Sequence, residues 1–99
     1  MNIVYQTARV NTPSIITSEG LALASFPDRR GWVIQNVGQN PVFVRLGGTA
    51  SDTVFHYVIK GGTADKDGLG GSVGHTEGVV FTGDIYIAGT TPKVVVTAM

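Results

Sequence analysis

Short apolar segments alternate with turn residues along the whole chain. Val, Ile, Thr and aromatic residues fill these segments, and such side chains suit the pleated surface of a β-sheet. Gly, Pro, Asn and Asp separate the segments at the close spacing that is typical of a sandwich or a barrel. The pattern predicts an all-β fold, a single antiparallel β-sandwich or jelly-roll-like barrel of about eight short strands. The strands are expected near 3–10, 14–17, 31–37, 42–47, 54–60, 78–81, 84–88 and 93–97.

Two short connections predict β-hairpins. The first joins 31–37 to 42–47 through a turn with Gly38, which tolerates a positive φ, and Pro41, which can open a strand where no N–H donor is needed. The second joins 79–81 to 85–87 through 82–84. Connections this short place the two strands side by side and antiparallel.

Two stretches do not follow the strand pattern. In 18–25, Ser18 could cap a turn of helix, but Gly20 and Pro27 leave too little length for a stable one. We expect a loop or a short irregular strand there. The stretch 61–74 is polar and rich in glycine, and loops of this length are usually functional or mobile.

Several predicted strands are apolar on both faces, although a sheet with one wet face requires alternation. Runs of three apolar residues occur at 32–34, 42–44, 57–59 and 94–96. A 99-residue sandwich cannot cover both faces of four such strands, so we expect a partner, most simply a second copy of the chain. The alternative is that twisted sheet edges and long loops hide these side chains. The candidate subunit or partner interface is Trp32, Phe43, Phe55, Tyr57 and Tyr86.

Composition narrows the classes of function. The length predicts one domain, 1–99, and only 14% of the residues are charged, against roughly 25% in an average soluble domain. Seven basic and seven acidic residues cancel, and the basic ones are scattered, so we expect no nucleic-acid partner. The absence of cysteine excludes disulfides and thiolate metal sites. We also expect no signal peptide, since no basic region precedes an apolar core, and no membrane span.

No motif in the chain predicts catalysis. Asp65 and Asp67 suggest a calcium loop, but Thr76 stands where an EF-hand requires a bidentate Glu, so a charged turn is the better interpretation. The glycine-rich stretch lacks a following helix and a Gly-Lys-Ser/Thr sequence, which argues against nucleotide binding. His56 and His75 lie far apart, with no metal-binding or triad spacing. We expect a non-enzymatic protein with no catalytic residues, no cofactor and no metal.

A resemblance adds a class of protein. Residues 29–47 show a basic residue, an apolar run, Gln-Asn, a Gly/Asn/Pro turn and a second apolar run that ends in Arg-Leu-Gly. Together with 54–64 and 89–92, this segment resembles small virion proteins of tailed bacteriophages, and the resemblance covers a little more than half of the chain. The matching motifs are turns and strands, so no catalytic residue carries over.

The resemblance implies a capsid decoration or other accessory structural protein that is located in the virion and made in the host cytoplasm. It implies a homo-oligomer, most simply a trimer, that contacts the major capsid protein or another virion protein. The segment 1–13 is equally compatible with an arm that reaches a neighbour and with a first edge strand.

Two other functions remain open at this stage. The aromatic residues, Trp32 among them, could form a sugar-stacking platform, as in a phage tail-tip or fibre module that binds a cell-surface glycan. The third alternative is an accessory domain of a bacterial enzyme.

Overall fold

The computed structural model describes residues 12–76 and 78–99, which form strands and loops but no helix. The all-β prediction is therefore confirmed. No helix in these ranges is long and apolar enough to cross a membrane. The strands are β1 (Ser14–Ile16), β2 (Gly20–Leu23), β3 (Trp32–Asn36), β4 (Val42–Leu46), β5 (Tyr57–Ile59), β6 (Ser72–His75), β7 (Ile85–Ala88) and β8 (Val94–Ala98).

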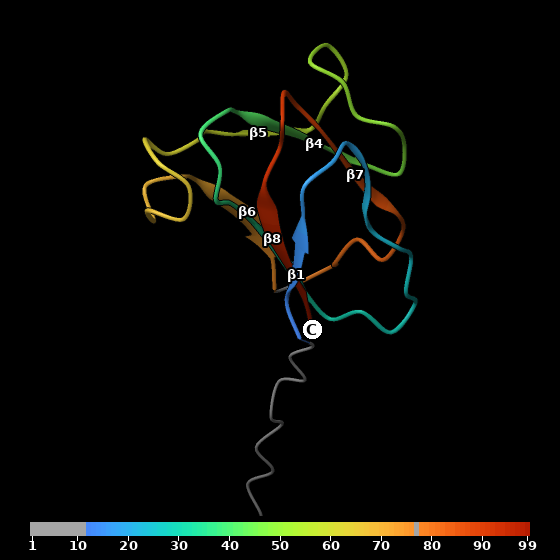
Figure 1. The fold of residues 1–99 in the computed structure, drawn as a ribbon. Helices are drawn as coiled ribbons and strands as arrows, with labels where there is room; N and C mark the ends of the chain where they lie inside the picture. Colours follow the sequence, from blue (N-terminus) through green and yellow to red (C-terminus); the bar gives the residue numbers. More distant parts are fainter. Residues whose placement is uncertain (1–11, 77) are drawn as a thin grey trace, which may run out of the picture.

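The strands form two antiparallel sheets of four, packed face to face as a β-sandwich (Figure 1). The first sheet has the order β1-β8-β3-β6 and the second the order β2-β7-β4-β5. In the view of Figure 1, the first sheet lies below the second, and the C-terminus lies beside the start of β1. The two late strands β8 and β7 each pair with two neighbours, so they hold the interior of the first and second sheets.

Every second residue of the central strands points into the core between the sheets. In β3 and β4, Trp32, Ile34, Val42 and Val44 are at most 1% exposed, while the residues between them are only half-buried. β7 and β8 contribute inward-facing Ile and Val in the same way. Full burial of such side chains contributes about 1.5–3 kcal/mol each, so this shared core is the main source of stability.

A buried asparagine ties the two sheets together. Asn36, the last residue of β3, is 1% exposed and donates hydrogen bonds from Nδ2 to the carbonyl oxygens of Asn40 (2.8 Å) and Ile59 (3.0 Å). Its Oδ1 accepts a hydrogen bond from the N–H of Gly38 (2.9 Å). Because Ile59 belongs to β5, the Asn36 side chain links the first sheet to the edge of the second.

A buried arginine joins two loops at the other end of the sandwich. Arg29 is 4% exposed, and its guanidinium donates to the carbonyl oxygens of Phe81 (3.1 Å), Gly83 (3.1 Å) and Ala24. Burial lowers the pKa of Arg29, and the negative charge of nearby Asp84 opposes this effect. The side chain therefore fixes 24–31 against 81–84.

The first predicted hairpin is wrong, because β3 and β4 belong to different sheets. Their inward side chains meet across the core, and the connection 37–41 crosses from one sheet to the other. The Asn36 side chain organises this crossing, and the N–H of Val37 donates to the carbonyl oxygen of Lys93 (2.9 Å). Gly38 does not adopt a positive φ. Lack of space favours glycine at this position, since an added Cβ would lie 3.1 Å from the Cβ of Lys93.

The second predicted hairpin is also wrong, because 78–81 is not a strand. Val79 is 93% exposed, and the carbonyl oxygen of Phe81 is bound by Arg29 instead of by a neighbouring strand. β7 pairs with β2 and β4. The segment 78–84 is therefore a loop held by side-chain contacts.

Two strands lie where the sequence predicted none or only an irregular one. β2 falls within 18–25, where a short irregular strand was one of the two expectations, and its register shifts between Leu21 and Leu23. β6 lies at the end of the glycine-rich stretch and pairs with β3. Gly74 permits this pairing, since an added Cβ would lie 2.5 Å from the carbonyl oxygen of Trp32. The expected strand 3–10, and most of the segment 1–13, lie outside the described residues.

Candidate interaction surface

Apolar side chains gather on the outer face of the second sheet. Leu21 of β2 pairs with Tyr86 of β7, and Phe43 of β4 pairs with Val58 of β5. Phe55, just before β5, packs its ring on that of Phe43, with the ring centroids 5.0 Å apart and the planes tilted by 55°. Cross-strand partners share one face of a sheet, so these five residues form one surface. We call Leu21, Phe43, Phe55, Val58 and Tyr86 the outer-face cluster.

Three members of the outer-face cluster are exposed as large apolar side chains. Val58 is 56% exposed, Leu21 47% and Phe55 41%, whereas Phe43 and Tyr86 are half-buried. A single polar strand position, Arg45, lies among them as the partner of Tyr86. A grouped apolar surface of this kind is typical of an interaction site, whereas isolated exposed residues are not.

The structure brings together three of the five residues predicted from the sequence. Phe43, Phe55 and Tyr86 belong to the outer-face cluster. Trp32 is instead a core residue, 1% exposed, because it occupies an inward position of β3. Its ring meets that of Tyr57 edge to face, with the centroids 6.3 Å apart. Tyr57 is itself an inward residue of the edge strand β5, where its ring remains 39% exposed.

The position of Trp32 corrects the proposed sugar-stacking platform. A ring that is 1% exposed cannot present a face to a sugar, so Trp32 offers no surface to a glycan or to a partner of the folded chain. Substitution of Trp32 would test the stability of the core instead of binding.

The outer face of the first sheet is less apolar. Ile15 is 56% exposed, and its partner Val95 is half-buried. The remaining outward positions include Gln35 and Thr97, which are polar. Within the apolar runs of β3, β4 and β8, successive residues therefore alternate between the core and the outer face. The outward residues of these runs are half-buried.

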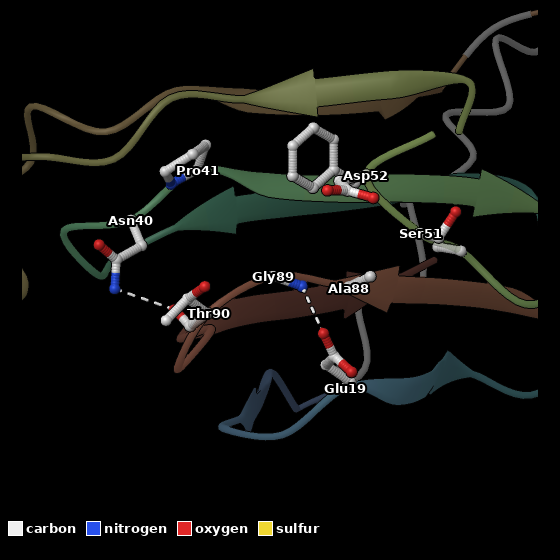
Figure 2. Close-up of a pocket in the computed structure, with 10 residues that line it drawn as sticks. Glu19, Asn40, Pro41, Ser51, Asp52, Ala88, Gly89 and Thr90 are labelled. Carbon is white, nitrogen blue, oxygen red and sulfur yellow. Dashed lines mark hydrogen bonds between the residues drawn. The ribbon is translucent and has the colours of Figure 1, made fainter. Parts of the chain in front are cut away.

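A groove of about 450 Å³ opens beside the outer-face cluster. It runs between the start of β4, the end of β7 and the loop that connects β4 to β5. In the view of Figure 2, Asn40 and Thr90 lie at one end, Ser51 and Asp52 at the other, and Glu19 lies below Gly89. The groove is lined by Glu19, Asn40, Pro41, Phe43, Ala50, Ser51, Asp52, Ala88, Gly89 and Thr90.

Hydrogen bonds within the chain fix the rim of the groove. Asn40 Nδ2 donates to the carbonyl oxygen of Thr90 (2.9 Å), and the N–H of Gly89 donates to Glu19 Oε1 (3.0 Å), as Figure 2 shows. Ser51 Oγ accepts from the N–H of Val54 (3.0 Å) and turns the loop inward. The first two bonds link segments that are distant in sequence, the third closes a local turn, and together they give the groove a defined shape.

The glycine-rich loop is a charged turn, as the sequence predicts. Asp67 accepts hydrogen bonds from the N–H groups of Leu69 (2.9 Å) and Ala64 (2.8 Å) and from the N–H and hydroxyl of Thr63. These bonds, led by those from Leu69 and Ala64, lower the pKa of Asp67 to about 2. Asp65 pairs with Lys93. Asp67 thus holds the loop together from within, whereas Asp65 ties it to Lys93. No group of three potential metal ligands occurs in 12–76 and 78–99.

The two histidines are separated in the structure as well. His56 Nδ1 accepts the N–H of Leu46 (3.0 Å), a bond that positions the end of the β4–β5 loop. His75 lies on the edge strand β6 of the other sheet. Neither histidine is hydrogen-bonded to a carboxylate of residues 12–76 and 78–99, the contact that would orient it for acid–base catalysis.

Sequence reasoning missed Leu21, Val58 and the groove. Val58 lies in an apolar run between Tyr57 and Ile59. Successive residues of a strand face opposite sides of the sheet, so Val58 faces outward if Tyr57 and Ile59 face inward, but the run alone does not show which residues face inward. Glu19 and Asp52 carry no such signal, because they line the same groove only through the packing of connections that are distant in sequence. No protein family, curated protein or solved structure matches this chain.

Proposed function

We propose that this chain is a non-enzymatic structural protein of a tailed-bacteriophage particle, a capsid decoration protein that binds to the shell as a homo-oligomer. The sequence resemblance supplies the class of particle. The single observation that carries the assembly role is the outer-face cluster, where three large apolar side chains are each more than 40% exposed on one face of one sheet.

The chemistry of the cluster suits a protein interface. Aromatic residues are enriched in the buried centres of interfaces, whereas charged residues are depleted there. The cluster supplies Phe43, Phe55 and Tyr86, and Arg45 is the one charged strand position that lies among its residues. The near-zero net charge of the chain leaves little electrostatic repulsion between copies. The cluster would form the contact between copies, in the trimer that the resemblance implies.

A charge introduced at Val58 tests the proposal. The full chain is examined by size-exclusion chromatography with light scattering at about 50 µM, and we expect a mass close to a multiple of 10.4 kDa, three in a trimer. Val58→Asp should reduce the mass to that of one chain, because a carboxylate buried in an apolar interface is strongly unfavourable. A monomeric wild-type chain, or an unchanged oligomer of Val58→Asp, would refute the assembly role.

Ile15→Asp is the matched control. Ile15 is also 56% exposed, but it lies on the outer face of the other sheet. This variant should keep the wild-type mass, and both variants should keep the wild-type circular dichroism spectrum.

A second measurement addresses the virion role directly. Tailed-phage capsids that lack this protein are incubated with the wild-type chain or with Val58→Asp and then sedimented. We expect the wild-type chain to co-sediment and to raise the temperature at which the capsids release DNA. Wild-type oligomers that leave capsid stability unchanged would contradict the decoration role while leaving self-assembly intact.

A further inference from the structure

We propose that the groove beside the outer-face cluster binds the side chain of a lysine or arginine that projects from a partner protein. This inference deepens the proposed function, on which it rests for the identity of the partner as a protein of the particle. The argument depends on the shape of the groove, on its remaining hydrogen-bonding capacity and on its charge.

The interior of the groove suits an aliphatic stem. Phe43, Ala88, Pro41 and Ala50 supply its apolar lining. Ala88 and Phe43 are Cα partners in β7 and β4, so they lie together on the outer face of the sheet. The methylene chains of lysine and arginine pack well on such surfaces while the charged head stays near the polar rim. A volume of about 450 Å³ accommodates one long side chain.

Two neutral side chains of the rim, Asn40 and Ser51, already make hydrogen bonds within the chain. Asn40 Nδ2 is bonded to the carbonyl oxygen of Thr90, and Ser51 Oγ is bonded to the Val54 N–H and lies 3.1 Å from Thr53 Oγ1. The charged side chains of the groove are both carboxylates. Glu19 uses only Oε1, for the Gly89 N–H, and Asp52 makes no hydrogen bond or ion pair with any residue in 12–76 and 78–99.

Carboxylates accept hydrogen bonds but do not donate them, so the ligand must be a donor. Ammonium and guanidinium groups only donate, and their positive charge complements Glu19 and Asp52. No basic residue lines the groove within the described chain, which argues against an anionic ligand. A sugar hydroxyl is uncharged, so it would gain less from two carboxylates than an ammonium or guanidinium group does.

The neighbouring cations of the chain are occupied elsewhere. Arg45 Nη1 donates to the carbonyl oxygen of Thr49 (3.1 Å), and Lys93 pairs with Asp65. Among residues 12–76 and 78–99, these two cations thus make their contacts away from Glu19 and Asp52, whose charge is available to a basic residue of a partner.

Nuclear magnetic resonance of the full ¹⁵N-labelled chain tests the inference. The probes are N-acetyl-lysine methylamide and N-acetyl-arginine methylamide, and N-acetyl-norleucine methylamide is the control that has an apolar stem without the charge. We expect the two basic probes to shift the amide signals of Ser51, Asp52, Gly89 and Thr90, with dissociation constants on the order of 1–10 mM. The norleucine probe should leave these signals unchanged.

Substitutions of the two carboxylates test their roles. Asp52→Asn and Glu19→Gln should each weaken binding of the lysine probe about two- to fivefold, and the double substitution about tenfold. Glu19→Gln retains an acceptor for the Gly89 N–H, so the rim should keep its shape. Asp28→Asn removes an exposed carboxylate from the loop between β2 and β3 and should leave binding unchanged.

Three results would overturn the inference. One is the absence of shifts with both basic probes at 100 mM, and another is an equal response to norleucine. The third is binding of methyl α-D-glucopyranoside at the same amides, which would indicate a saccharide site. These probes act on one chain and require no assembly, so failure here leaves the Val58 test unaffected, and failure of that test leaves this one interpretable.

Discussion

Replacement of Asn36 by alanine should lower the free energy of unfolding by about 3 kcal/mol. The substitution removes three hydrogen bonds, two to carbonyl oxygens of Asn40 and Ile59 and one from the N–H of Gly38. An intramolecular hydrogen bond contributes about 1 kcal/mol, and a buried group left without a partner costs about 1–3 kcal/mol. Part of the cost is relieved at the Asn40 carbonyl, which lies in a turn that water can reach.

Urea denaturation measures this loss. The chain has one tryptophan, Trp32, and its burial in the core makes its fluorescence a direct report of folding. A domain of this size is stable by about 5–15 kcal/mol, so Asn36→Ala should still fold. The midpoint should fall while the dependence on urea, which reports the surface exposed on unfolding, stays unchanged.

Gln35→Ala is the matched control, because Gln35 is the preceding residue of β3 and faces outward. Its effect should be within about 0.5 kcal/mol. A loss below about 1 kcal/mol for Asn36→Ala, or one equal to that of Gln35→Ala, would refute the idea that this side chain joins the two sheets.

Two further predictions concern charged groups. Arg29→Met should destabilise the chain by about 3 kcal/mol in the same urea assay, because three carbonyl oxygens lose a charged donor. Arg29→Lys keeps a charged donor and should lower the free energy of unfolding by less. An equal loss of stability in the two variants would show that packing matters more than hydrogen bonding at this position. The Asp67 carboxyl should titrate near pH 2 by nuclear magnetic resonance. Since its folded pKa lies below the unfolded value of 3.8, its stabilisation of the loop is complete above about pH 4 and is lost as the pH falls towards 2. A titration midpoint at the ordinary value would contradict the bonding of this loop.

Local pattern predicts where the central strands lie more reliably than it predicts which strands are neighbours. The apolar runs at 32–34 and 42–44 correctly marked two central strands, because burial selects such residues wherever the strands lie. A short turn between them suggested a hairpin, but the same inward pattern also serves two strands that face each other across a core. In the structure, the three hydrogen bonds of the Asn36 side chain hold the connection that crosses between the sheets. The sequence does not show these bonds, since their partners are set by the fold.

Strands without an apolar pattern were harder to predict. β6 has one large apolar residue, Val73, and forms because Gly74 allows the backbone to approach β3. The segment 78–81 shows the opposite case, since Val79 and Val80 suit a strand but the carbonyl oxygen of Phe81 is bound by Arg29. Nothing in the adjacent Arg29 and Arg30 indicated that the first of them is buried.

The candidate surface was partly predictable for a similar reason. Aromatic composition identified Phe43, Phe55 and Tyr86, which share one face. It also selected Trp32 and Tyr57, because an apolar run does not reveal which of its members points inward. The groove arises from contacts such as that between Glu19 and Gly89, which are seventy residues apart and leave no local trace.

The positions of β7 and β8 have a consequence for the synthesis of the chain. Until residues 85–98 leave the ribosome, β1 and β2 have no partner strand, and only the pairs β3–β6 and β4–β5 can form. Both sheets therefore close only after residues 85–98 are available, through contacts between distant parts of the chain, which is a slow kind of folding. A nascent or prematurely terminated chain would expose its unpaired strand edges and depend on chaperones to avoid aggregation.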